Sequence, residues 1–246
     1  MNPQYTDDYL TRLYALYNAP ETATEMFGPP PKGREHFLPT KRDKNIELIS
    51  RFARRGKFLA IGCGSGDEMR AAIASGWQVE GYDVDPVATA EVAERLGVPV
   101  YSGSLATSIG SLPAHSYDCV YLDQVLEHPK DPAEYLRLAH RLLKPDGVLY
   151  LGVPNIRSVS SIFKIFLGKR GWKAFRGRHY DSWHHLFYYS PASLKFLLSQ
   201  IFSFDVLLVG GDPVPTSSGV KERLGNWLRE RFAFLDSSFR VLARPT

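Results

Sequence analysis

Apolar and polar positions along the chain follow two alternating patterns, which predict strands and helices in turn. Between residues 57 and 153, short β-rich runs are separated by stretches whose apolar side chains recur at helical spacing. The predicted strands are Lys57–Ile61, Gln78–Tyr82, Val98–Tyr101, Tyr117–Leu122 and Val148–Val153. Strands that alternate with helices in this way are typical of βαβ units, which build a parallel sheet.

Helices are predicted between these strands and again toward the C-terminus. The first follows the segment GCGSG and ends near Ser75, and the second begins near Pro86, since proline is tolerated in a first turn. A third helix, Asp131–Leu143, is amphipathic. An aromatic and basic stretch follows residue 155. The elements predicted beyond it are a helix from about Pro191, a strand at Phe204–Val209, a helix at Val220–Arg231 and a strand at Phe239–Ala243.

Together these elements predict an α/β fold. It is a doubly wound, seven-stranded, mostly parallel sheet with an N-terminal helical cap and an insertion after the fifth strand. With 246 residues, 44% of them apolar and 23% charged, the chain is long enough for one domain with its own core. The start, MNPQYTDDYL, does not resemble a secretory signal, and no apolar run reaches the roughly 20 residues of a membrane span. The two cysteines, Cys63 and Cys119, fit a reduced, cytoplasmic protein.

A glycine-rich turn is the strongest local sign of chemistry. Gly62, Gly64 and Gly66 follow a strand and open a helix, where small residues allow a ligand to approach free backbone N–H groups. Asp83 comes 21 residues after Gly62, at the end of the next strand, where a carboxylate can accept hydrogen bonds from two ribose hydroxyls. The alternative is that Asp83 only caps the helix at Pro86, a role for which Asp85 competes. The pattern favours nucleoside binding, and its glycine spacing differs from the dinucleotide pattern GxGxxG.

Several segments in the same order resemble a known enzyme family. They are LAIGCGSG, VEGYDVDP, SYDCVYLDQVLEHPKDP, LLKPDGVLYLGVPN and HHLFYYSPASL. The chain resembles the class I S-adenosylmethionine-dependent methyltransferases from about residue 40 to 210, and within them the small-molecule branch that includes the ubiquinone-biosynthesis O-methyltransferases. The resemblance implies one methyltransferase domain over residues 1–246. Its parts are a helical cap (1–50), a cofactor-binding half (51–155), an aromatic and basic lid (156–190) and the rest of the sheet (191–246).

The resemblance also implies a set of cofactor-binding residues. S-adenosyl-L-methionine is the expected cofactor, and S-adenosyl-L-homocysteine the product. Asp83 would hold the ribose, and Gln124 would line the methionine and methyl end. Gly62, Cys63, Gly64 and Gly66 would line the methionine part, and Val84, Ser104 and Leu105 would lie near the adenine.

Two positions depart from the pattern of the resembled family. An acidic residue usually stands two positions before the first glycine, where it organises the turn and the cofactor's amino group, and this chain has Ala60 there. A second acidic residue often lies near the adenine, where this chain has Ser104. One interpretation is a rearranged cofactor site in which Asp123 or Asp67 compensates. The other is a catalytically decayed, nucleoside-binding or scaffold protein, and the intact glycines and Asp83 favour the active enzyme.

Methylation of a hydroxyl group usually needs a base, and histidine has a suitable pKa. His128 follows the fourth strand at the carboxyl edge of the sheet, where ligands bind in such folds, and is the first candidate. Its alternative role is to brace the loop with Glu127 or Asp131. His184 and His185 are rival candidates in the lid, whose aromatic residues could hold a flat or apolar acceptor or simply pack against the sheet.

Other partners are weighed against the same residues. We expect no metal, because Pro154 stands where a carboxylate would accompany Asn155 and Asp123 alone offers too few oxygen ligands. Nucleic acid is the weaker substrate class, because residues 123–126, DQVL, lack the signature of base-modifying enzymes.

The net charge of +4 is concentrated in residues 164–180, which include six lysines and arginines. Residues 161–178 allow three interpretations. They can form a solvated helix face, or lie at a membrane surface with Phe163 and Phe166 inserted, which suits a lipid-like acceptor. In the third interpretation Arg176 and Arg178 bind an anionic group of the acceptor.

Overall fold

The computed structural model describes residues 41–171, 185–212 and 232–246. Seven strands form one sheet in the order β3-β2-β1-β4-β5-β7-β6. They are β1 (Lys57–Ile61), β2 (Gln78–Asp83), β3 (Val100–Ser102), β4 (Tyr117–Asp123), β5 (Leu143–Pro154), β6 (Phe204–Gly211) and β7 (Ser238–Pro245). All neighbours from β3 to β5 are parallel, and β7 runs antiparallel to both β5 and β6. The predicted doubly wound, mostly parallel sheet is therefore confirmed.

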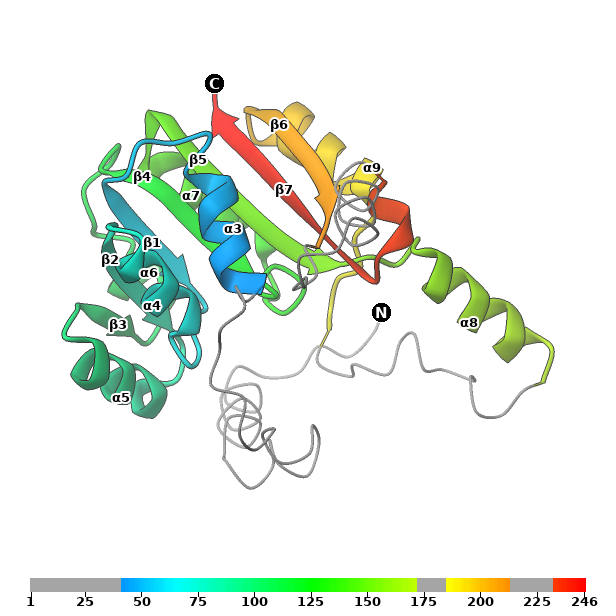
Figure 1. The fold of residues 1–246 in the computed structure, drawn as a ribbon, viewed down its shortest axis with the longest axis horizontal. Helices are drawn as coiled ribbons and strands as arrows, with labels where there is room; N and C mark the ends of the chain where they lie inside the picture. The colour runs from blue at the N-terminus through cyan, green and yellow to red at the C-terminus, as the bar shows by residue number, and fades with distance from the viewer. Residues whose placement is uncertain (1–40, 172–184, 213–231) are drawn as a thin grey trace, which may run out of the picture.

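Helices cover both faces of this sheet (Figure 1). They are α3 (Lys41–Ile49), α4 (Asp67–Ala74), α5 (Pro86–Leu96), α6 (Leu105–Ser108), α7 (Pro132–Leu142), α8 (Val159–Lys169) and α9 (Pro191–Phe196), with a π-helical turn at Leu197–Ile201 and a 3₁₀ turn at Ala233–Leu235. Side chains alternate along each strand, so the sheet divides the interior into two cores. One core contains buried residues of α6, α7 and α9, and the other contains those of α3, α4 and α5.

The strand order places a topological switch between β1 and β4. Chain connections leave β1 toward β2 on one side, while β4 pairs with the other side of β1. Ligands of open α/β sheets bind at the carboxyl edge beside such a switch. The glycine turn after β1, Asp83 at the end of β2 and the loop after β4 all lie on this edge.

The fifth strand is longer than predicted. The sequence predicted a turn at residues 144–147 and a strand only from Val148, whereas β5 begins at Leu143. Leu143 pairs with Tyr117 and pairing resumes at Val148 with Cys119, so the turn residues form an irregularity within one strand.

Parts of the predicted architecture lie outside the described residues. These parts are most of the N-terminal cap, residues 172–184 of the lid and the predicted helix Val220–Arg231. No helix in the described ranges combines the length and the apolar character that crossing a membrane requires.

Candidate active site

The three glycines after β1 have left-handed backbone conformations but different surroundings. Their φ angles are 72° at Gly62, 46° at Gly64 and 71° at Gly66, a region that side chains disfavour. A Cβ atom at Gly62 would collide with Val125, and one at Gly66 would lie 2.6 Å from Val92. A Cβ at Gly64 would meet no atom within 4 Å. Gly62 and Gly66 thus serve close packing, and Gly64 leaves the open space that a bound cofactor needs.

Asp83 is tied directly to this turn. Its Oδ2 atom accepts a hydrogen bond from the Gly64 N–H at 2.9 Å, and its Oδ1 accepts one from the Asp85 N–H at 3.2 Å. Burial raises the pKa of Asp83, and these amide hydrogen bonds oppose the rise. The cap of α5 is Asp85, which accepts from the N–H groups of Val87 and Ala88. Asp83 is therefore free of the capping role, which leaves ribose binding as its predicted function.

The residues expected near the adenine have structural partners of their own. Ser104 caps α6 by accepting from the Thr107 N–H, and its hydroxyl lies 2.6 Å from the Thr107 hydroxyl. Leu105 is buried in the core, and Val84 packs against the same core while staying partly exposed. Their contacts with the cofactor stay predictions. Leu105 is the one of these three side chains that is buried, whereas Val84 is partly exposed and Ser104 exposed.

The loop after β4 lies against the glycine turn. Gln124 has a left-handed backbone with φ of 58° and donates its N–H to the Gly152 carbonyl oxygen at 2.8 Å. Such a conformation is costly for a residue other than glycine and is often found at functional sites. It places the exposed Gln124 side chain beside Val125, which contacts Gly62. Cys63 is buried, and burial raises the pKa of its thiol to about 12, so it is not a nucleophile.

Two of the three histidine candidates meet at a buried carboxyl group. His128 Nε2 lies 3.9 Å and His185 Nε2 4.0 Å from the same oxygen atom, Glu127 Oε1. The two imidazole rings touch edge to face, with their centroids 4.8 Å apart. His184 lies outside the described residues. Residues 128 and 185 are distant in sequence, so the fold creates this pair.

Backbone contacts bring the two segments together. The Glu127 carbonyl oxygen accepts from the N–H groups of Leu186 at 2.8 Å and Phe187 at 3.1 Å. The Tyr189 hydroxyl donates to the Leu126 carbonyl oxygen at 3.1 Å. The segment 185–189 is thus fastened to the loop after β4, and His185 belongs to the same edge as the glycine turn.

From the sequence, Glu127 was expected only as a partner with which His128 would brace the loop after β4. It is fully buried, and within the described ranges neither carboxyl oxygen has a hydrogen-bond partner. Burial raises its pKa to about 8, and the negative charge of Asp123 adds to the rise. A buried carboxyl group without hydrogen bonds is costly, which makes Glu127 a candidate functional residue. The sequence signal was its place beside His128, but nothing local linked it to His185.

The same three side chains could hold a metal ion. One ligand atom of each lies within 4.8 Å of the others, so small movements would suffice to coordinate a divalent cation. From the sequence, Asp123 and Asn155 were the two possible metal ligands, and no metal was expected. The Asn155 amide donates to the carbonyl oxygens of Ala233 and Asp236, and its Oδ1 accepts from the Arg157 N–H, so Asn155 fastens the end of β5.

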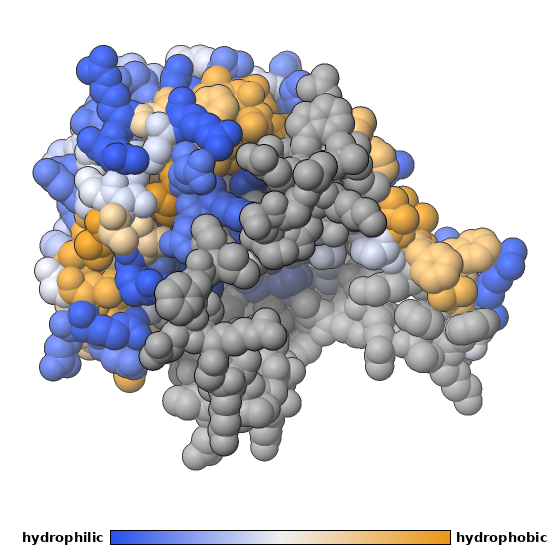
Figure 2. Space-filling view, in the orientation of Figure 1, coloured by the Kyte–Doolittle hydropathy of each residue, from blue (hydrophilic) through white to orange (hydrophobic). Residues whose placement is uncertain are grey.

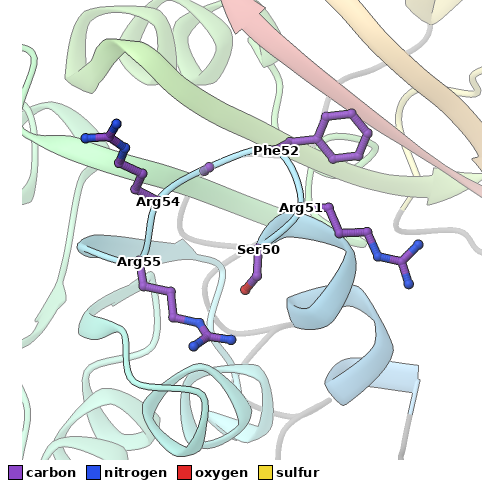
Figure 3. A pocket seen from close by; sticks show the side chains of 6 residues that line it. Ser50, Arg51, Phe52, Arg54 and Arg55 are labelled. Carbon is purple, nitrogen blue, oxygen red and sulfur yellow. The ribbon is translucent and has the colours of Figure 1, made fainter.

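A hollow of about 540 Å³ lies at the other edge of the sheet and is a poor candidate for the site. It is formed by residues 50–55, the loop between α3 and β1. In Figure 3 the guanidinium groups of Arg51, Arg54 and Arg55 lie apart and do not meet at one point. Binding sites usually have converging polar groups, so we place the active site at the carboxyl edge.

Fold and site together define the class of the protein. A doubly wound sheet whose carboxyl edge carries a glycine turn, and an aspartate at the end of β2 hydrogen-bonded to that turn, fits a class I S-adenosylmethionine-dependent methyltransferase domain. Residues 34–207 match the family described as "Methyltransferase domain". The chain belongs to this family, and S-adenosylmethionine is its cofactor.

Relatives match smaller parts of the chain. It is 34% identical over 113 residues to the ubiquinone biosynthesis O-methyltransferase of Pseudomonas aeruginosa, which covers 44% of this chain and 49% of that protein. An uncharacterized 37.1 kDa protein in transposon TN4556 of Streptomyces fradiae is 32% identical over 124 residues, 48% of this chain and 36% of that protein. The chain thus spans about half or less of the length of these curated relatives.

Solved structures agree in fold. A S-adenosylmethionine-dependent methyltransferase from Archaeoglobus fulgidus superposes with a TM-score of 0.55 at 19% identity, over 82% of this chain and 94% of that one. The [4+2]-cyclase SpnF gives a TM-score of 0.61 at 18% identity, over 98% and 96%. These identities establish the fold alone, and SpnF is named for a cyclisation, so the reaction must be argued from the site.

Proposed function

We propose that this domain methylates a hydroxyl group of a small molecule, with His128 as the base. The observation that carries the proposal is the fully buried Glu127 between the imidazoles of His128 and His185. The P. aeruginosa relative is named an O-methyltransferase of ubiquinone biosynthesis, which supports a small hydroxylated acceptor.

The chemistry divides between cofactor and protein. The cofactor supplies a methyl group on a positively charged sulfur, which is already a good leaving group. The protein must align the acceptor, exclude water and remove the hydroxyl proton. His128 accepts that proton, and the Glu127 carboxylate stabilises the resulting imidazolium. His185 lies against the His128 ring and keeps it oriented.

The first experiment titrates the protein with S-adenosylhomocysteine by calorimetry, because this ligand binds without knowledge of the acceptor. A panel of hydroxylated aromatic acceptors then identifies a substrate. In His128→Ala we expect kcat to fall by about a hundredfold or more while the Kd of S-adenosylhomocysteine stays within twofold. His115→Asn is the matched control, because His115 is exposed, precedes β4 at the opposite edge and has a left-handed backbone that asparagine tolerates.

Other outcomes would reject or change the proposal. Equal losses of turnover and cofactor binding in His128→Ala would show that His128 braces the loop. A larger loss of turnover in His185→Ala than in His128→Ala would make His185 the base. Loss of activity after dialysis against EDTA, restored by a divalent cation, would show that the Glu127, His128 and His185 cluster acts through a metal.

A further inference from the structure

Position 60 lacks the acidic residue that the resembled family usually has there, and the neighbouring strand carries an aspartate two residues beyond the partner of Ala60. Ala60 on β1 is directly paired with Tyr121 on β4. Side chains of paired residues in parallel strands point to the same face, as do residues two positions apart. Asp123 therefore projects from the face on which an acid at position 60 would project, and it lies at the carboxyl end of the strand.

The other candidate, Asp67, has a different setting. It lies in the first turn of α4, its side chain is 41% exposed, and it pairs with Arg42 at 3.4 Å. The Asp123 side chain is 19% exposed. An exposed carboxylate that already has a cationic partner gives little binding energy to a second cation, because solvent screens the attraction.

Asp123 has one oxygen atom with polar partners and one without a hydrogen bond. Its Oδ2 lies 3.4 Å from Lys41 Nζ and accepts from the Tyr121 hydroxyl at 3.4 Å. Its Oδ1 is inaccessible and has no hydrogen-bond partner in the described part of the chain. Gly152 on β5 makes the room for this oxygen, since any Cβ there would collide with it. A terminal carboxyl torsion is soft, so either oxygen can be presented to a ligand.

The charges around Asp123 leave room for a further cation. Lys41 is shared, because its ammonium also lies 2.9 Å from Asp212. Arg42 pairs with Asp67 and Glu68, and Arg240 donates to the Asn45 side chain at 3.0 Å. The negative charge of Asp123 contributes to the raised pKa values of both Glu68 and Glu127. In this arrangement one ammonium group serves two carboxylates.

We propose that Asp123 binds the ammonium group of the cofactor's methionine part, in place of the acid that position 60 lacks. The charge of the ligand then completes the set formed by Lys41, Asp123 and Asp212. This inference rests on the cofactor and is independent of the acceptor and of the base. It makes Asp123 a binding residue that is specific to the amino acid end of the ligand.

Two ligands separate this role from a general one. S-adenosylhomocysteine carries the ammonium group, whereas 5′-methylthioadenosine keeps the nucleoside and the sulfur but lacks it. By calorimetry, Asp123→Asn should weaken S-adenosylhomocysteine about tenfold or more and leave methylthioadenosine within twofold. Asp83→Asn should weaken both ligands, because both contain the ribose. Asp67→Asn, the matched acidic control, should change neither by more than twofold.

A rescue variant tests the exchange of positions. Adding Ala60→Asp to Asp123→Asn should restore the affinity for S-adenosylhomocysteine to within about threefold of the original.

Unchanged binding in Asp123→Asn would overturn the proposal, and so would equal losses for both ligands in a folded variant. If Asp123→Asn does not fold, Ala60→Asp alone decides. If Ala60→Asp raises the affinity for S-adenosylhomocysteine by less than threefold, an acid is already in place, and a larger gain overturns the proposal. Failure of the unmodified chain to bind either ligand would instead reject the cofactor itself.

Discussion

The two ends of the site are built by different means. At the cofactor end, the glycine turn and Asp83 lie within 22 residues of one another and are joined by a backbone N–H of Gly64. At the acceptor end, Glu127 and His128 meet His185, more than 55 residues away, and the two segments are joined by hydrogen bonds to the Glu127 carbonyl oxygen.

The two ends of the site should therefore differ in how many amino-acid substitutions they tolerate. Backbone geometry at the glycine turn depends on small residues and left-handed φ angles, which few substitutions preserve. The acceptor end is defined by side chains from separate segments, which can vary without disturbing the sheet. A common cofactor half with a variable acceptor half follows from this division.

The largest effect should come from breaking the cofactor end. Asp83→Ala removes the acceptor of the Gly64 N–H and of the predicted hydrogen bonds from the ribose hydroxyls, so we expect the Kd of S-adenosylhomocysteine to rise about a hundredfold. Asp85→Ala is the control two residues away. It removes the cap of α5 and should cost about 1 kcal/mol of stability while leaving the Kd within twofold. Calorimetry with thermal unfolding of both variants measures this, and similar Kd values for the two would contradict the ribose role.

A smaller effect should mark the acceptor end, through the pH dependence of Glu127. Its pKa is about 8 in the folded protein against 4.5 as the reference, so between these values the folded state holds a proton that the unfolded state has lost. Stability from this group is therefore full below pH 4.5 and declines as the pH rises toward 8. Glu127→Gln removes this decline. The melting temperature of the variant minus that of the unmodified chain should therefore be a few °C higher at pH 8.5 than at pH 5.

The matched control is Glu134→Gln, because Glu134 is exposed on α7. Its melting temperature should follow that of the unmodified chain across the same pH range. The same series tests the proposed base, since ionised Glu127 is the form that stabilises the imidazolium of His128. Turnover should rise with pH toward 8 in the unmodified enzyme and lose this rise in Glu127→Gln. If the unmodified chain and Glu127→Gln show the same pH dependence of melting temperature and of turnover, the expectations for stability and for the base are both contradicted.

Local patterns made much of the cofactor end predictable. The strand Lys57–Ile61 has its predicted bounds, and α5 begins at the predicted Pro86, because a buried strand and a proline at a helix start leave short-range signals. The question of which aspartate caps α5 stayed open until the structure showed Asp85 in that role. Both carboxylates are near enough to the helix start, and only the hydrogen bonds distinguish them.

The acceptor end could not be predicted to the same depth. The meeting of His185 with Glu127 depends on long-range hydrogen bonds, which leave no periodic trace in the sequence. The sequence offered Asp123 and Asp67 as alternatives to an acid at position 60, and it is the register between β1 and β4, which sequence alone does not give, that favours Asp123. α8 is a third example. The sequence left three interpretations of residues 161–178 open, and only the structure shows that Val159, Ile162, Phe163 and Phe166 are all exposed.

The smallest expected effect concerns α8, which projects from the body of the molecule (Figure 1) and carries an apolar surface with a hydrophilic far end (Figure 2). Its exposed apolar residues lie at i, i+3, i+4 and i+7: Val159, Ile162, Phe163 and Phe166. Lys169 and Arg170 follow at its end, with the Arg170 guanidinium 4.2 Å from the centre of the Phe166 ring. Apolar side chains beside basic ones suit the surface of an anionic bilayer. We therefore propose that α8 brings the acceptor end to such a surface.

Sedimentation with lipid vesicles tests this contact. Vesicles rich in phosphatidylglycerol should bind the protein more tightly than phosphatidylcholine vesicles, and high salt should reduce the difference. Phe163→Ser should lower the partition coefficient several-fold, because it removes a side chain that would enter the interface. Phe196→Ser on α9 is the matched control, since Phe196 is 62% exposed and Phe163 58%. Equal binding of the two variants would contradict the proposal. A dimer in ultracentrifugation that Phe163→Ser dissociates would show instead that α8 pairs with a second copy of the chain.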